Sequence, residues 1–124
     1  MIFIDRSIPR SVAEALKLVR EDVRWLEDEF AHDVPDADWL REVGSRGWLV
    51  IGRDRRIRYR PAEKQAILDH RVGHFCIAQD ANPTRWEYLR LIVGTLDQME
   101  QLFATVERPF IYGVYKDGAF RRLL

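Results

Sequence analysis

The sequence predicts an α/β fold: a three-layer α/β/α sandwich around a mainly parallel sheet of about five strands, with a β-hairpin at the C-terminal end. Short apolar runs alternate with longer segments of helical apolar spacing from residue 1 to about residue 115. Such alternation is typical of right-handed βαβ units with helices on both faces of the sheet. After it, Lys116-Asp117-Gly118-Ala119 has the composition of a hairpin turn and leads into a short last strand.

Length and composition indicate a single domain over residues 1–124. The chain has 124 residues, of which 47% are hydrophobic and 32% charged, which is enough for one core and too little for two. Its 20 basic and 20 acidic residues balance, so net charge favours no class of partner. The single Cys76 excludes an internal disulfide, and no leader segment or apolar run of the roughly 20 residues that a membrane span needs is found. We therefore expect a cytoplasmic protein without a membrane partner.

The strands are predicted from short apolar runs. The clearest is Trp48–Ile51, where four consecutive apolar residues, two of them β-branched, are short enough for a strand buried on both faces. Gly52 is expected to break this run, and the acidic residues 27–33 are expected to form a loop. The predicted strands are residues 1–4, 23–26, 48–51, 74–78 and 110–115.

The helices are predicted from capping signals and from apolar residues three or four positions apart. The capping signals are Ser11 with Glu14, Thr84 with Glu87, Pro61 in a first turn, and Gly44 with Gly47 at a helix end. The third helix is expected to run from Pro61 to about His70, and Pro109 is expected to stop the last and longest helix. The residues expected to face the core are Val12, Ala15, Leu16 and Val19, then Trp39, Leu40 and Val43, then Ala62, Ala66 and Ile67, and finally Leu89, Ile92, Val93, Leu96, Met99, Phe103 and Val106.

Acidic residues follow the predicted strands or open a predicted helix. Asp5 ends the first strand and Asp36 opens the second helix, while Asp54 and Asp80 follow the third and fourth strands. In a parallel sheet these turns lie at the same edge, so acids far apart in sequence can share one pocket. Carboxylates held close together repel one another unless a cation neutralises them, and Mg²⁺ or Mn²⁺ takes carboxylate oxygen as ligand. Such a site can activate a water molecule and balance charge on a phosphodiester during cleavage.

Each acid taken alone also has a structural explanation. Asp5 could cap the loop before the first helix, and Asp36 or Asp38 could stabilise the start of the second helix. Asp54 could form salt bridges with the arginines beside it. The occurrence of three acids at equivalent ends of successive βα units favours the metal site, with either Asp36 or Asp38 as the middle acid.

A basic segment surrounds Asp54 in a chain that is neutral overall. Arginine binds phosphate through two parallel hydrogen bonds, and a tyrosine can stack on an unpaired base, so the segment favours RNA binding. The alternatives are a solvated loop and a patch that pairs with residues 27–33 across a self-interface. The basic segment consists of Arg53, Arg55, Arg56, Arg58 and Arg60 with Tyr59 between them.

The histidines and the cysteine give little support for other chemistry. His32, His70 and His74 lack the short ligand spacing of a zinc site, and no cysteine pair exists. His70 and His74 are expected to end a helix and to begin a strand, and Cys76 is expected to fill the core.

A strand that ends in Asp5, the helix start Asp36-Ala37-Asp38-Trp39-Leu40 and the run from Gly47 to Asp54 together resemble the PIN-like domains. Within that family the sequence is most similar to the branch of VapC-type toxin ribonucleases of toxin–antitoxin pairs. Gly52 differs from the pattern, because a hydroxyl residue usually stands there. The resemblance implies an α/β/α sandwich that binds Mg²⁺ or Mn²⁺ and cleaves RNA, with Asp5, Asp36 and Asp54 as the catalytic, metal-binding acids and Asp38 or Asp80 as further ligands. It also implies an antitoxin protein as partner and a homodimer.

The predicted function is therefore that of a metal-dependent endoribonuclease and toxin, with Arg53, Arg55, Arg56, Arg58 and Tyr59 contacting RNA. One alternative is a catalytically inactive PIN-like module that binds RNA or protein through the basic segment. A phosphoacceptor receiver domain is a further alternative, since Asp54 follows the third strand. It is disfavoured because Arg6, not a second acid, follows Asp5, and because Ala78 ends the fourth strand without a hydroxyl residue.

Overall fold

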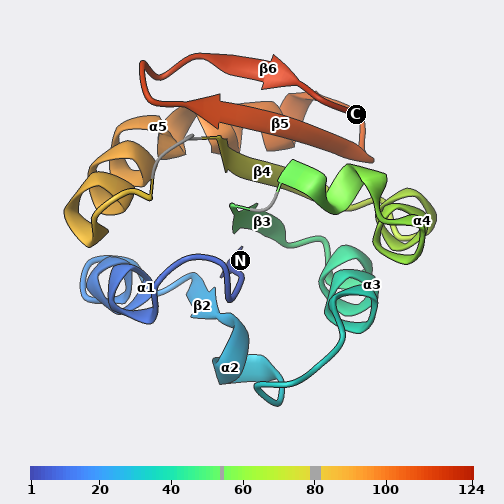
Figure 1. Cartoon of the computed structure of the whole chain (residues 1–124). Helices are drawn as coiled ribbons and strands as arrows, with labels where there is room; N and C mark the ends of the chain where they lie inside the picture. Colours follow the sequence, from blue (N-terminus) through green and yellow to red (C-terminus); the bar gives the residue numbers. More distant parts are fainter. Residues whose placement is uncertain (54, 79–81) are drawn as a thin grey trace.

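The computed structural model describes residues 1–53, 55–78 and 82–124, with the side chain of Arg55 left out. It shows the predicted α/β sandwich (Figure 1). In chain order the elements are β1 (Ile2–Ile4), α1 (Arg10–Lys17), β2 (Val23–Trp25), α2 (Leu26–Glu29), α3 (Asp36–Arg46), β3 (Leu49–Gly52), the 3₁₀ helix η1 (Arg55–Tyr59), α4 (Pro61–Asp69), β4 (Gly73–Ala78), α5 (Arg85–Thr105), β5 (Phe110–Tyr115) and β6 (Phe120–Arg122).

The sheet has the strand order β2-β1-β3-β4-β5-β6. All neighbours pair in parallel except β5 and β6, which form the predicted C-terminal hairpin. Ile4 pairs with Ile51, and Gly52 pairs with Cys76 in the next strand. Because of this register, Asp5 leaves β1 at the level at which β3 ends.

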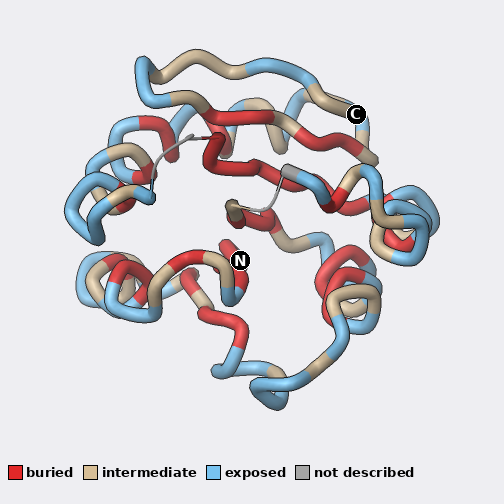
Figure 2. The backbone as a smooth tube through the Cα atoms, in the orientation of Figure 1, coloured by how far each residue is buried: buried red, intermediate tan, exposed pale blue. Residues whose placement is uncertain are grey.

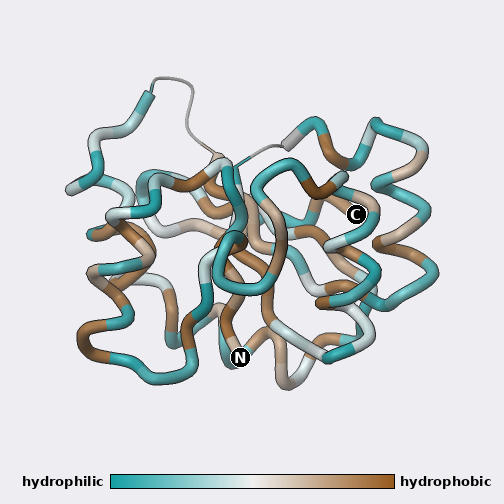
Figure 3. Tube along the Cα trace, turned by 90° about the horizontal axis from the view of Figure 1, so that it is seen from below, coloured by the Kyte–Doolittle hydropathy of each residue, from teal (hydrophilic) through white to brown (hydrophobic). Residues whose placement is uncertain are grey.

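Helices cover both faces of the sheet, with α1 and α5 on one face and α3 and α4 on the other (Figure 1). Side chains alternate between the faces along each strand. Ile4 and Ile51 therefore belong to the core beneath α1 and α5, and Phe3 and Val50 to the core beneath α3 and α4. The buried residues concentrate in the central strands (Figure 2), and hydrophobic residues line the strands at the centre of the view in Figure 3.

The first helix differs from its prediction at both ends. Its N-cap is Pro9, no side chain caps it, and the expected pairing of Ser11 with Glu14 is not formed. Proline has no side-chain acceptor, so it caps no backbone N–H of the first turn. The helix ends at Lys17, which leaves Val19 outside it and 78% exposed.

Residues 27–33 are not a loop throughout, because α2 begins at Leu26 directly after β2. The Asp28 carboxylate accepts a hydrogen bond of 2.8 Å from the backbone N–H of Trp25. An acid three residues after the N-cap stabilises a helix start in this way. The predicted second strand is therefore one residue shorter, ending at Trp25.

The glycines near the end of α3 have different roles. Gly44 lies inside the helix, where a Cβ would come within 2.5 Å of the His70 carbonyl oxygen, so it allows α3 and α4 to approach closely. Gly47 ends the helix with a φ of 70°, a conformation that suits glycine. Gly52 does not break β3 but is its last residue.

Two helix residues predicted to face the core are exposed. Ala62 lies in the first turn of α4, where the buried positions are Ala66 and Ile67. Val93 is 58% exposed because it follows the buried Ile92 by one position, about 100° around the helix. The predicted capping box of Thr84 with Glu87 is confirmed. The predicted extent of β5 is also confirmed, and α4 ends at Asp69, one residue before the predicted end. Within the described ranges, no helix is both long and apolar enough to cross a membrane.

Candidate active site

Asp5 lies at the carboxyl end of β1 and is only 5% exposed. Its backbone N–H donates to the Ile51 carbonyl at 3.0 Å, which fixes it against β3. Its Oδ1 accepts hydrogen bonds from the backbone N–H of Ser7, at 2.8 Å, and from the Ser7 hydroxyl. Burial raises the pKa of Asp5 to about 6, although the hydrogen bonds from Ser7 act in the opposite direction. A carboxylate in this setting favours a nearby positive charge.

Ser7 connects the loop after β1 to the loop after β3. Its hydroxyl donates to Asp5 and accepts a 2.8 Å hydrogen bond from the backbone N–H of Arg53. Ser7 therefore supplies, from the first loop, a hydroxyl group that Gly52 does not provide. Ser7 was not among the predicted site residues, and the signal that could have identified it is a serine two residues after the acid that ends a strand.

Gly52 leaves the space that the Asp5 carboxyl group occupies. A Cβ at this position would lie 2.3 Å from Asp5 Oδ2 and 2.9 Å from its Cγ. No side chain can be added there unless the carboxyl group moves. The absence of a hydroxyl residue at the end of β3 is thus linked to the position of Asp5.

Asp36 is brought toward Asp5 by the start of α3. Its Oδ1 accepts a 2.9 Å hydrogen bond from Trp39 Nε1, one turn along the helix. The carboxylate lies 3.7 Å from the Arg6 guanidinium and 4.0 Å from that of Arg60, and it is half-buried. Its negative charge contributes to the raised pKa of Asp5, after burial as the main cause, so the two carboxylates share one electrostatic environment.

Arg6 holds the segment before α3 in place. Its guanidinium donates to the carbonyls of His32, at 3.0 Å, and Val34, and its positive charge lies close enough to Asp5 to oppose the rise of that pKa. Asp38, the alternative middle acid, is exposed on α3. The geometry therefore favours Asp36 over Asp38 as the partner of Asp5.

Two buried polar residues that were not among the predicted site residues are related to Asp5, His74 by its distance and Tyr88 through the charge of Asp5. His74 in β4 is 1% exposed, and its Nε2 lies 4.0 Å from Asp5 Oδ2. Tyr88 in α5 is 3% exposed, and burial raises its pKa while a hydrogen bond with Arg53 opposes the rise. Both residues lie in apolar stretches of the sequence, which typically form a core, so neither was assigned to the site. Each is a polar residue on a face of its element that is otherwise buried and apolar. His70 is the C-cap of α4, as predicted, and His74 is the second residue of β4, which begins one position before the predicted strand start.

Arg53 fixes the backbone just before residue 54. Its N–H donates to Ser7, and its carbonyl accepts a 3.0 Å hydrogen bond from the thiol of the buried Cys76. Its side chain donates to Asn82 Oδ1 at 3.1 Å. The predicted ligands Asp54 and Asp80 lie outside the described residues.

The basic segment folds into η1 beside Asp36, which the guanidinium of Arg60 approaches. Tyr59 is 70% exposed, and the guanidinium of Arg58 lies 4.6 Å from the centre of its ring. Arg56 is exposed, and the side chain of Arg55 is outside the described part. As for the predicted pairing with residues 27–33, Glu29 in that stretch pairs with Arg24 and Arg46 of the same chain.

The residues present suit a divalent cation of the magnesium type. Mg²⁺ is usually bound by one or two carboxylates together with water and substrate phosphates. Asp5 and Asp36 supply two carboxylates, and Asp5 is a buried acid whose charged form is disfavoured without a cation. Among residues 1–53, 55–78 and 82–124, no three histidine, cysteine or acidic side chains form a metal-binding group.

Comparison with known proteins identifies the family. The sequence model of the family described as PIN like domain matches residues 1–79, which include β1 to β4 and the acids Asp5 and Asp36. Searches of curated proteins and of solved structures find no match. The match covers more than half of the chain and agrees with the observed sheet, so the chain belongs to the PIN-like domain family.

Proposed function

We propose that the protein is a nuclease that cleaves RNA phosphodiesters with the aid of Mg²⁺ or Mn²⁺. The observation that carries the proposal is the buried Asp5 carboxylate, with its raised pKa, close to Asp36 at the carboxyl edge of a parallel sheet. Membership of the PIN-like family supports a nuclease module in general. In this proposal Asp54 is the third metal-binding acid, and Asp80 is a fourth candidate.

The side chains around the acids would have distinct roles. Asp5 and Asp36 would hold the cation, which when bound supplies an activated water and charge for in-line attack at phosphorus. Ser7 holds the Asp5 carboxyl group in place, and Arg6 keeps the start of α3 close to β1. Exclusion of bulk water by the buried surroundings of Asp5 strengthens its attraction to a cation.

The experiment that tests this function is cleavage of a labelled RNA by purified protein with Mn²⁺ and with EDTA. We expect Asp36→Asn to reduce the cleavage rate at least 100-fold, because it removes a charge beside Asp5 while the amide oxygen can still accept from Trp39. Asp38→Asn, two residues away on the exposed side, is the matched control and should cleave within about twofold of wild type. Equal loss in both variants would contradict the assignment of Asp36.

A second candidate function is RNA binding without cleavage, favoured by the exposed Tyr59 stacked against Arg58. A stacked base contributes about 1–3 kcal/mol, so Tyr59→Ala should weaken binding of a single-stranded RNA in EDTA by roughly 5- to 150-fold. Tyr59→Phe keeps the ring and should bind nearly as wild type. Fluorescence anisotropy with a labelled oligonucleotide gives both values. Binding that is unchanged in Tyr59→Ala would exclude the stacking role, and cleavage with any divalent metal would exclude the inactive module.

We extend the proposal to a toxin of a toxin–antitoxin pair that acts in the cytoplasm, with an antitoxin protein as partner and a homodimer as the assembly. The support for this extension is the sequence resemblance to the VapC-type branch. The metal site and the RNA cleavage do not depend on it.

A further inference from the structure

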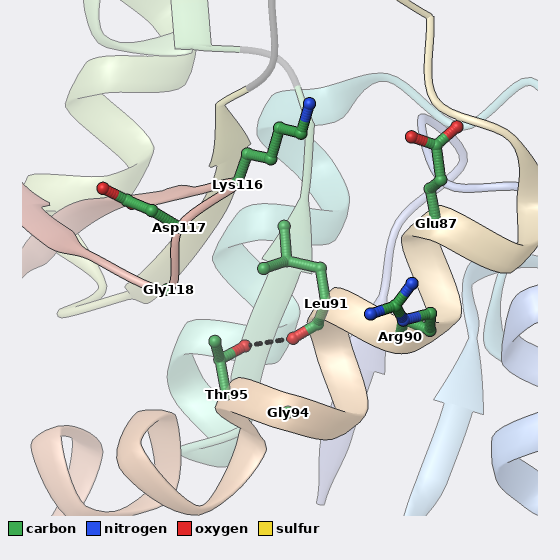
Figure 4. A pocket seen from close by; sticks show the side chains of 8 residues that line it. All are labelled: Glu87, Arg90, Leu91, Gly94, Thr95, Lys116, Asp117 and Gly118. Carbon is green, nitrogen blue, oxygen red and sulfur yellow. Dashed lines mark hydrogen bonds between the residues drawn. The ribbon is translucent and has the colours of Figure 1, made fainter.

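A hollow lies between helix α5 and the turn that joins β5 to β6 (Figure 4). It has a volume of about 310 Å³, in the size range of small-molecule sites. Arg90, Leu91 and Gly94 line it from α5, and Lys116 lines it from the turn. Lys116 follows the last residue of β5, so the hollow opens at the same carboxyl edge of the parallel sheet as the acidic site.

Two cations at this hollow are available to a ligand. Within the described parts of the chain, the side chains of Arg90 and Lys116 form no ion pair or hydrogen bond. Two acids lie nearby. Glu87 accepts from the N–H of Thr84 at 3.0 Å, and this hydrogen bond, together with the charges of Lys116 and Arg90, lowers its pKa, while Asp117 accepts from the N–H of Ala119 at 3.0 Å. Figure 4 shows Asp117 pointing away from Leu91, which lies between the two cations. The hollow therefore offers two cations that have no direct ion pair among the described residues, next to an acid, Glu87, that already accepts from the backbone.

Gly94 leaves the floor of the hollow open. It lies in the interior of α5, where glycine destabilises a helix relative to alanine. A Cβ at this position would have no atom within 4 Å, so no close packing requires a glycine there. Gly118 is different, because its φ of 84° is explained by the turn. The open position at Gly94 points to a ligand that approaches the helix backbone.

We propose that the hollow is a second phosphate-binding site for the RNA strand held at the acidic site, with Arg90 and Lys116 binding a backbone phosphate and the surface of Leu91 and Gly94 contacting the adjoining nucleoside. The inference rests on the proposed function in taking RNA as the ligand. Strand spacing and register put Lys116 roughly 15–20 Å from Asp5. An RNA must therefore be several nucleotides long to occupy both sites.

The test measures binding in EDTA, so that it does not depend on cleavage. The full-length Arg90→Ala/Lys116→Ala variant is compared with wild type by anisotropy of a labelled 12-nucleotide oligouridylate. We expect about tenfold weaker binding at low salt, and a slope of log affinity against log salt that is smaller by about 0.7, the value for one phosphate contact of a single strand. The dinucleotide UpU has one phosphodiester and cannot span both sites, so the wild-type protein should bind it far more weakly than the 12-mer, as followed by NMR.

Two further variants separate this site from general charge and from folding. Arg41→Ala/Lys64→Ala removes the same two residue types from α3 and α4, on the other face of the sheet, and should leave the 12-mer affinity within about twofold. Gly94→Leu fills the hollow and should weaken 12-mer binding by about tenfold, while the Tm stays equal or rises by a few degrees because leucine is the better helix former.

Several outcomes would overturn the inference. They are equal loss in the Arg41→Ala/Lys64→Ala control and unchanged 12-mer binding in either hollow variant. AMP or inorganic phosphate that binds the hollow as tightly as the 12-mer would assign it to a free phosphate compound. If the wild-type protein fails to cleave RNA with any metal yet these binding differences are found, the nuclease proposal fails and the second site stands.

Discussion

Asp5→Asn is expected to abolish Mn²⁺-dependent cleavage of RNA and at the same time to stabilise the metal-free protein at neutral pH. Cleavage should fall at least 100-fold, since the variant loses the buried negative charge that would bind the cation. The stabilisation has a separate cause. The pKa of Asp5 is raised from 3.8 to about 6 in the folded protein, because burial disfavours the carboxylate. The folded state therefore loses stability as this group ionises, and an uncharged amide avoids that loss.

The difference in the free energy of unfolding between wild type and Asp5→Asn should depend on pH. At pH 4 the carboxyl group is protonated in the folded chain and about half ionised in the unfolded chain, so the two proteins should have similar free energies of unfolding. As the pH rises through 6, the wild type loses up to about 3 kcal/mol relative to Asp5→Asn. Urea unfolding in EDTA at pH 4 and pH 7.5 measures the difference. Added Mn²⁺ should stabilise the wild type and not the variant. An Asp5→Asn protein that cleaves RNA normally would remove the proposed mechanism.

Gly52→Ala is expected to impair both stability and cleavage. The added Cβ would lie 2.3 Å from Asp5 Oδ2, and the carboxyl group cannot move aside without breaking its hydrogen bonds to Ser7. We expect a loss of about 1–3 kcal/mol in the free energy of unfolding, as in other overpacked interiors. Cleavage should fall by at least tenfold, since the carboxylate leaves its position.

A double-mutant cycle tests the cause of the Gly52→Ala effect. In an Asp5→Ala background the carboxyl group is absent, so adding Gly52→Ala should cost much less stability than it does in wild type. Gly94→Ala, at a position where a Cβ meets nothing within 4 Å, is the control for the substitution itself and should not destabilise the protein. The same loss in both backgrounds would show that the clash with Asp5 is not the cause.

The layers of the fold and the position of Asp5 were predictable because they depend on local patterns. Apolar runs of strand length and helical spacing between them give the alternation of elements, and a parallel sheet then places the residue after β1 at its carboxyl edge. Asp36 was predictable for the same reason, as the first residue of a helix that begins at that edge. The family resemblance drawn from these residues is confirmed by the family match, whereas the toxin branch stays a prediction.

The contacts around Asp5 were not predictable, because they depend on how separate segments meet. The space above Gly52 exists only through the register of β1 and β3, and the bridge from Ser7 to Arg53 requires both loops to be in place. Tyr88 and His74 come from α5 and β4, and no local signal relates them to residue 5. The exposure of Val19 was missed because periodicity does not indicate where a helix stops.

The outermost strands of the sheet, β2 and β6, affect how copies of this chain can associate. Each is only three residues long, and β2 passes directly into α2, which turns the chain away. On β6, Arg121 and Arg122 are exposed, with their guanidinium groups 4.9 Å and 5.9 Å from the rings of Tyr115 and Tyr112. Short edge strands with exposed charged side chains oppose intermolecular strand pairing. An assembly of this protein would accordingly form through its helical surfaces rather than by continuing its sheet into a neighbour.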